Sequence, residues 1–253
     1  MSTSGSAGFG MAAMSAFSLP GPRRESAPAG APEPRGVRAL VAGIEAILDP
    51  SGALYWPEMD TLVVSDLHLE TGSSYARSGQ MLPPYDTAIT LDRLVDVVCR
   101  YSPERIISLG DAFHDPFGPE RLSARARATL MALCEVAEMI WITGNHDHAA
   151  AEAIGGHAVE RLTLGSVTFR HIPTAGQPAS AEIAGHLHPA ARIVVRGRPL
   201  KRRAFVSCER RLVMPAFGCL TGGLPVSDAA FAPLWPDGPA AVHLIARHGV
   251  YRV

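Results

Sequence analysis

The sequence lacks the features that would place it among membrane proteins or disulfide-bonded proteins. Its four cysteines are scattered along 253 residues without a C-x-x-C pair, which favours buried free thiols in a reducing cytosol. No apolar run reaches the roughly 18 to 20 residues of a membrane-spanning helix, so we expect a cytoplasmic protein with no membrane partner. The net charge of −1 excludes a globally cationic nucleic-acid coat, but it leaves room for a local basic patch.

The first segment of the chain is set apart by its composition. It is rich in Ala, Gly, Pro and Ser, and its basic residues Arg23 and Arg24 follow a mildly apolar stretch, whereas a secretory signal places such residues before one. We therefore predict a disordered tail over residues 1–37. The remainder is 38–253, whose apolar content is enough for one domain with a sizeable core.

The first half of the domain alternates between strand patterns and helix patterns. A hairpin is predicted from runs 40–48 and 53–56, which flank a turn cluster. Asp86 or Thr87 can cap a helix that ends near Pro103. A second helix is predicted over residues 119–135. The buried strands between these elements are predicted at residues 61–65, 105–109 and 139–143.

The second half shows strand patterns only. This change from alternating elements to consecutive strands predicts an α/β fold in which two mixed β-sheets pack together and are flanked by helices. The predicted strands of this half are residues 159–164, 167–171, 182–184, 193–195, 204–207, 212–215 and 242–246.

Polar side chains that can bind a metal follow the buried strands of the first half. Asp66 and His68 are two residues apart, so in an extended segment both point to the same side. Asp111 follows Gly110, which lets the backbone turn sharply. Asn145 offers a neutral carbonyl oxygen. Each of these residues alone can equally be explained by ordinary turn capping or local packing.

Histidines in the second half add to the pattern. His186 and His188 repeat the two-residue spacing after Gly185, and His171 ends its own strand. His171 alone is most simply a half-buried core histidine. Together, however, the polar groups at the ends of apolar runs are all types that ligate borderline or hard cations, which predicts a metal site.

In this order, the motifs D-x-H, G-D, G-N-H-D, H and G-H-x-H resemble the calcineurin-like metallophosphoesterase superfamily, which implies a four-layer sandwich. The resemblance implies a centre of two divalent cations, manganese above all, with iron, zinc or magnesium as alternatives. His146 matches the position that protonates or stabilises the leaving oxygen, and Asp147 is expected to orient its loop. The implied ligands are Asp66, His68 and His188 for one metal, Asn145, His171 and His186 for the other, and Asp111 as the bridge.

Further segments resemble one bacterial group, the ligase-associated DNA damage response endonucleases (PdeM). This resemblance implies a phosphodiesterase or endonuclease acting on DNA in repair, with a DNA ligase and a helicase as partners. Thr71 departs from the group, in which a lysine is common at this position. The similar segments are residues 52–57, 65–70, 83–87, 110–116, 141–147, 182–189, 217–218 and 221–224.

A basic run directly follows the G-H-L-H motif and has Glu209 as its only acid. It is predicted to follow a phosphodiester backbone. An edge strand whose cations prevent aggregation is the alternative. The predicted nucleic-acid contacts are Arg192, Arg196, Arg198, Lys201, Arg202 and Arg203, and the run also contains Arg210 and Arg211.

Three functions fit these observations. The first is a metal-dependent nuclease or phosphodiesterase acting on DNA. The second is a small-molecule phosphatase or nucleotide pyrophosphatase. The third is a non-catalytic DNA-repair module whose metals are structural. Turnover of a phosphodiester, compared with a phosphomonoester and a metal-free control, separates them.

Overall fold

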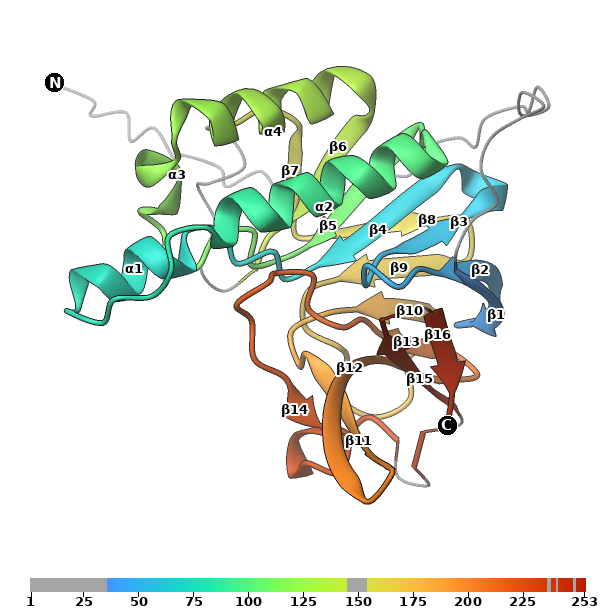
Figure 1. The fold of residues 1–253 in the computed structure, drawn as a ribbon. Helices are drawn as coiled ribbons and strands as arrows, with labels where there is room; N and C mark the ends of the chain where they lie inside the picture. The colour runs from blue at the N-terminus through green and yellow to red at the C-terminus, as the bar shows by residue number, and fades with distance from the viewer. Residues whose placement is uncertain (1–35, 145–153, 236–237, 240, 248) are drawn as a thin grey trace, which may run out of the picture.

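The computed structural model describes residues 36–144, 154–235, 238–239, 241–247 and 249–253. Two β-sheets pack against each other, and helices cover the outer face of the first sheet (Figure 1). The predicted α/β fold of two packed mixed sheets is therefore confirmed. The predicted tail falls outside the described residues except for its last two positions, and Val37 already begins a strand.

The first sheet has seven strands whose spatial order is their chain order. The first three pairings are antiparallel, and the pairings from β4 to β7 are parallel. Parallel neighbours bring the carboxyl ends of β4, β5 and β6 to one edge, where ligands bind in such sheets. The strands are β1 (Val37–Val41), β2 (Ile44–Leu48), β3 (Leu54–Trp56), β4 (Thr61–Ser65), β5 (Arg105–Leu109), β6 (Glu138–Ile142) and β7 (His157–Val159).

Two predicted strands are each divided in the structure. Residues 40–48 were predicted as one strand, but β1 and β2 form a hairpin whose turn residues, Ala42 and Gly43, both have positive φ. Alanine gives no sequence signal for that backbone conformation. The predicted strand over residues 159–164 is also wrong, because β7 lies in the first sheet and β8 (Arg161–Leu164) lies in the second.

Helices α1 (Thr71–Arg77), α2 (Asp86–Tyr101), α3 (Gly118–Arg121) and α4 (Ala124–Val136) lie on one side of the first sheet (Figure 1). The apolar periodicity of α2 is confirmed by the burial of Leu91, Leu94 and Val98. The single helix predicted over residues 119–135 is interrupted. Ser123 is extended there, and its side chain accepts a hydrogen bond from Ala126 N, so it caps a new helix.

The predicted cap of α2 is also wrong. Tyr85 is the N-cap residue and makes no capping hydrogen bond with its side chain. The side chains of Asp86 and Thr87 instead accept hydrogen bonds from the backbone nitrogens of Gly72 and Glu70, at 3.1 and 2.8 Å. They therefore hold the start of α1 against α2.

The second sheet has nine strands. Seven lie in the order β14-β11-β12-β13-β10-β9-β8, and β15 pairs with both β12 and β16. Strands β11 and β12 are longer than predicted and form a two-stranded ribbon that extends away from the rest of the sheet (Figure 1). In addition to β8, the strands are β9 (Val167–Arg170), β10 (Ala181–Ala184), β11 (Pro189–Val195), β12 (Arg198–Cys208), β13 (Arg211–Val213), β14 (Leu224–Pro225), β15 (Ala241–Ala246) and β16 (Gly249–Arg252).

Apolar side chains of the first sheet alternate between two cores. In β4, Leu62 and Val64 face the helices, whereas Val63 faces the second sheet. Ile106 and Ile107 of β5 divide in the same way. Because both faces of these strands are buried, the strands read as continuous apolar runs. The second sheet contributes Phe169, Ile183, Phe205 and Leu212 to the core between the sheets.

The outer face of the second sheet carries a third apolar cluster. Phe231, Leu234 and Trp235 pack there with Val206 and Leu244. The covering segment contains the short 3-10 helix η2 (Ala229–Phe231). Within the described part of the chain, the layer on this face is therefore a loop with one 3-10 turn.

The cysteines are free, as predicted, but their predicted burial is wrong. Cys99 is exposed, and Cys134, Cys208 and Cys219 are half-buried. None of the helices in the described part of the chain is both long and apolar enough to cross a lipid bilayer.

Candidate metal centre

The candidate ligands of the first sheet leave neighbouring strands at one edge. Ser65 of β4 pairs with Leu109 of β5, so Asp66 and Asp111 emerge close together. The backbone holds the two loops in register, because His68 N donates to Asp111 O at 2.9 Å. The third strand of this set, β6, ends two residues before Gly144. The predicted ligand Asn145 and the predicted catalytic residues His146 and Asp147 lie outside the described residues.

Five candidate ligands have a left-handed backbone, which is uncommon for residues other than glycine. The φ values are 52° for Asp66, 44° for His68, 44° for Asp111, 71° for His186 and 46° for His188. Such residues cost on the order of 1–3 kcal/mol each and persist where the surrounding structure fixes them. Their concentration at one place marks a functional site.

Two glycines allow the ligand loops to approach each other closely. A Cβ atom on Gly110 would lie 2.2 Å from His171 Nδ1, and one on Gly185 would lie 2.6 Å from Asp66 Oδ2. Gly110 also has a positive φ of 71°. A side chain at either position would therefore separate the two sheets at the ligands.

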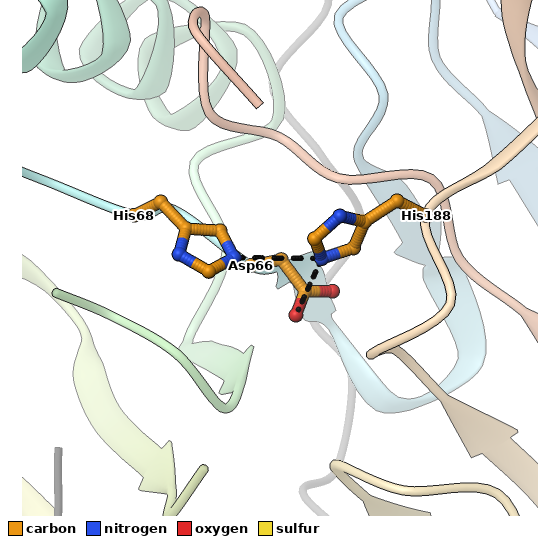
Figure 2. A group of neighbouring side chains, drawn as sticks. All are labelled: Asp66, His68 and His188. Carbon is orange, nitrogen blue, oxygen red and sulfur yellow. Dashed lines mark hydrogen bonds and ion pairs between the residues drawn. The ribbon is translucent and has the colours of Figure 1, made fainter. Parts of the chain in front are cut away.

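Asp66, His68 and His188 form the first of two clusters (Figure 2). His188 Nε2 lies 3.2 Å from Asp66 Oδ1 and 3.4 Å from His68 Nε2. The other carboxylate oxygen, Asp66 Oδ2, accepts hydrogen bonds from Ser65 Oγ and, at 3.0 Å, from His186 N. These bonds fix the carboxylate so that Oδ1 faces the imidazoles.

Asp111, His171 and His186 form the second cluster. His171 Nδ1 lies 3.0 Å from the carbonyl oxygen of Leu109. Since a carbonyl can only accept, Nδ1 carries the proton and Nε2 presents its lone pair to the cluster. That Nε2 is 3.1 Å from His186 Nδ1 and 3.5 Å from Asp111 Oδ2.

Asp111 belongs to the second cluster and also approaches the first. Its Oδ2 atom is 3.8 Å from His68 Nε2 of the first cluster and 3.5 Å from His171 Nε2 of the second. One carboxylate oxygen is therefore within reach of ligands from both clusters, as the predicted bridging role requires. Asp111 Oδ1 and His68 Nδ1 are buried and have no hydrogen-bond partner within the described part of the chain.

The proximity of Asp66 and His188 shifts their pKa values in opposite directions. Burial alone would raise the pKa of Asp66, but the hydrogen bond and charge of His188 outweigh it, so the pKa of Asp66 lies below its ordinary value. Burial alone would lower the pKa of His188, but Asp66 and Asp111 outweigh it, and the pKa of His188 is raised. Since a histidine must be deprotonated to ligate a metal, metal binding at His188 competes with protonation of its imidazole.

Two of the three other imidazoles in the clusters have lowered pKa values. Burial lowers the pKa of His68 to about 4. Burial, together with the neighbouring His171, also lowers the pKa of His186. A neutral imidazole has a free lone pair, so these rings can ligate a metal without first losing a proton.

The donor set fits two divalent cations. Carboxylate oxygens and imidazole nitrogens are ligands of borderline and hard metal ions. A buried carboxylate oxygen without a donor, as at Asp111 Oδ1, is costly unless a positive charge lies beside it. The structure therefore brings together six of the seven predicted ligands in two clusters, and the seventh, Asn145, lies outside the described residues.

The segment after β13 supports this centre, although residue patterns gave it no structural role. Phe217 N donates to Ser65 O at 2.7 Å, and Gly218 N donates to Asp66 O at 3.1 Å. Arg93, from α2, donates to the Phe217 carbonyl and stacks on its ring at 4.6 Å. This segment therefore fixes the backbone of the first ligand.

Arg203 belongs to the same support and does not face solvent with the other predicted DNA contacts. Its Nη1 donates to Ala216 O at 2.7 Å, and its Nη2 donates to Ser51 O at 3.1 Å. Burial, with the nearby charge of Arg93, lowers the pKa of Arg203 to about 10. Arg211 is fully buried and pairs with Glu182 at 2.7 Å.

The remaining basic residues of the run divide between two faces of the β11–β12 ribbon. Arg192 and Lys201 lie opposite each other in the ladder and therefore share a face. Arg198 and Arg202 lie one residue out of phase with them, on the other face. Arg196 is in the turn at the end of the ribbon and has a positive φ. The basic run is therefore not a single ridge.

The comparisons with known proteins agree with this geometry. The family model of the calcineurin-like phosphoesterases matches residues 59–236, and the chain belongs to this family. It is a metal-dependent phosphoesterase, and the predicted enzyme class is confirmed.

Among solved structures, the chain is similar to the nuclease MPE of Pseudomonas putida, with 26% identity and a TM-score of 0.67 over 86% of this chain and 100% of that one. It is also similar to Yfce, a phosphoesterase from E. coli, with 12% identity and a TM-score of 0.40 over 76% of this chain and 97% of that one. No curated protein matches the sequence.

Proposed function

We propose that this phosphoesterase is a two-metal phosphodiesterase that cleaves DNA in DNA repair. The observation that carries the proposal is that one groove opens at each cluster. A groove of about 490 Å³ is lined by His68 and His188, and another of about 420 Å³ is lined by Gly144 and His171. A phosphodiester continues on both sides of its phosphorus, whereas a monoester continues on one. A centre open at both clusters therefore suits a diester.

The likeness to a nuclease supports this proposal. Two divalent cations, which we propose to be manganese, would supply the positive charge that binds and polarises the phosphate. The ligand residues position that charge. The hydrogen bond from His171 Nδ1 to Leu109 O keeps His171 in the tautomer whose Nε2 can bind a cation. We assign proton delivery to the leaving oxygen to His146, with Asp147 orienting its loop. The proposed repair role and the proposed ligase and helicase partners come from the family resemblance, and the proposed cytoplasmic location comes from the scattered cysteines.

The proposal is tested by hydrolysis of single-stranded, nicked and duplex DNA. With manganese, we expect internal cleavage of at least one of these substrates, loss of cleavage on chelation, and recovery when manganese is returned. Hydrolysis of p-nitrophenyl phosphate, a monoester, should be slower. Efficient hydrolysis of a monoester or a nucleotide pyrophosphate with no cut in any DNA would contradict the proposal and favour the small-molecule function.

The β11–β12 ribbon offers a surface for the DNA backbone next to the metal centre. The Lys201 ammonium donates to the carbonyl oxygen of Gly223. A Cβ atom on Gly223 would lie 2.8 Å from the carbonyl oxygen of the ligand His188. The face with Arg192 and Lys201 therefore adjoins the first cluster. The opposite face carries Ile193 and Ala191, which pack into the third apolar cluster.

This arrangement predicts that the two faces differ in DNA binding. Neutralising Arg192 and Lys201 to glutamine should weaken binding to single-stranded DNA and flatten its salt dependence by about 0.7 in log–log slope for each lost contact. The matched control is the double change of Arg198 and Arg202 to glutamine, which removes the same charge from the other face. Binding titrations over a range of salt concentrations measure both. If both double variants weaken DNA binding equally, the effect is one of general charge. If neither double variant weakens DNA binding, the edge-strand alternative is favoured.

A further inference from the structure

The groove at the first cluster differs in chemistry from the groove at the second. Its walls include Tyr75, Leu82, Leu220 and Thr221, and none of the described residues that line it is a lysine, arginine, aspartate or glutamate. The groove at the second cluster is lined by Arg161, Arg170 and Glu160. Beyond the metal ligands His68 and His188, the wall of the first groove is therefore mainly apolar and aromatic.

Tyr75 is held at this wall by local structure. It lies four residues after Thr71 on α1, so the two side chains share a face of the helix, and both line the groove. The Tyr75 carbonyl accepts hydrogen bonds from Ser78 N and Gln80 N, both at 3.0 Å, which closes the end of the helix. The hydroxyl of Ser78 also donates to this carbonyl, at 2.8 Å.

A row of neighbouring rings connects the metal ligands with Tyr75. The rings of His188 and His68 are 5.2 Å apart, those of His68 and His114 are 5.9 Å apart, and those of His114 and Tyr75 are 5.4 Å apart. The Tyr75 side chain nevertheless stays 37% exposed. One face of the ring is therefore supported while part of the ring remains open to a ligand.

We infer that Tyr75, with Leu82 and Leu220, forms a stacking site for the nucleobase next to the phosphate held at the metal centre. This inference rests on the proposed function and names the part of the substrate that the groove takes. Bases stack on aromatic side chains whatever their sequence, because every base has a π-face. The groove would therefore favour nucleic acid over other diesters without choosing a sequence.

The test compares a short single-stranded oligothymidylate with an abasic strand of the same length and charge. For the manganese-loaded protein, kcat/KM should be higher on the base-containing strand. Tyr75→Ala should lower kcat/KM on that strand by roughly 5-fold to 150-fold, the range for loss of one stacked base, and leave the abasic strand unchanged. Tyr75→Phe, which keeps the ring, should retain the preference.

Tyr251→Ala is the matched control, because Tyr251 is an exposed tyrosine on β16, outside the groove. It should cleave both strands as the unmodified protein does. If Tyr75→Ala lowers kcat/KM equally on both strands, the residue acts on the architecture of the centre. If it lowers kcat/KM on neither strand, the residue binds no base. Either result overturns the inference. Equal cleavage of both strands by the unmodified protein overturns it too, while the proposed function stands. If neither strand nor any other DNA is cut, both fail.

Discussion

Asp111→Asn should lose bound metal and activity together while the fold survives. The substitution removes a negative charge that lies within 4 Å of an imidazole nitrogen in each cluster. Charge stabilisation by a metal is worth several kcal/mol, so turnover should fall by roughly 10³-fold or more. Metal analysis and hydrolysis of DNA, measured on the same preparation, check both effects.

The unfolding temperature of metal-free Asp111→Asn gives a second test of the same role. Asp111 Oδ1 is buried without a hydrogen-bond donor in the described part of the chain, so replacing the carboxylate by an amide removes a buried charge. The metal-free variant should therefore unfold at a temperature no lower than the metal-free parent. Asp115→Asn is the control for loss of a carboxylate outside the metal centre. Asp115 pairs with Arg121 at 2.7 Å and belongs to neither cluster. Two metal ions retained by Asp111→Asn would contradict the bridging role.

His146→Ala should lower DNA cleavage by roughly 10²-fold to 10⁴-fold, the range for loss of a general acid. Its metal content should stay normal, because the two clusters already account for the histidine ligands among the described residues. The loss should be smaller with bis(p-nitrophenyl) phosphate, whose leaving group departs without a proton. Steady-state kinetics on both substrates, with metal analysis, make the measurement.

His157→Ala serves as the control for that experiment. His157 is an exposed histidine at the start of β7 and belongs to neither cluster. It should leave both reactions unchanged. Near-normal DNA cleavage by His146→Ala, or loss of a metal ion from it, would show that His146 is not the proton donor.

Local patterns predicted those parts of the fold that local interactions determine. The period of Leu91, Leu94 and Val98 identified α2, because a helix needs a continuous apolar face. The two-residue spacing of Asp66 and His68 and of His186 and His188 pointed to the site, but the extended backbone from which we argued is wrong. All four residues have positive φ, and His186 and His188 lie in different clusters.

Features that depend on distant partners could not be predicted in this way. Helix α1 has no apolar stripe in its sequence, Thr-Gly-Ser-Ser-Tyr-Ala-Arg, and it is held by bonds to Asp86 and Thr87 of α2. The basic run illustrates the same limit. Arg203 and Arg211 resemble the other arginines in sequence, but Arg203 bonds to Ser51 O, 152 residues away, and Arg211 pairs with Glu182, 29 residues away.

If the Asp111 carboxylate joins two cation sites, two manganese ions bound there should be magnetically coupled. Metal analysis combined with electron paramagnetic resonance of the manganese-loaded protein makes the measurement. We expect two ions per chain and an exchange-coupled spectrum in the unmodified protein. Asp111→Asn, which should lose metal, should not show the exchange-coupled spectrum. A single ion per chain, or two ions without coupling in the unmodified protein, would contradict the account.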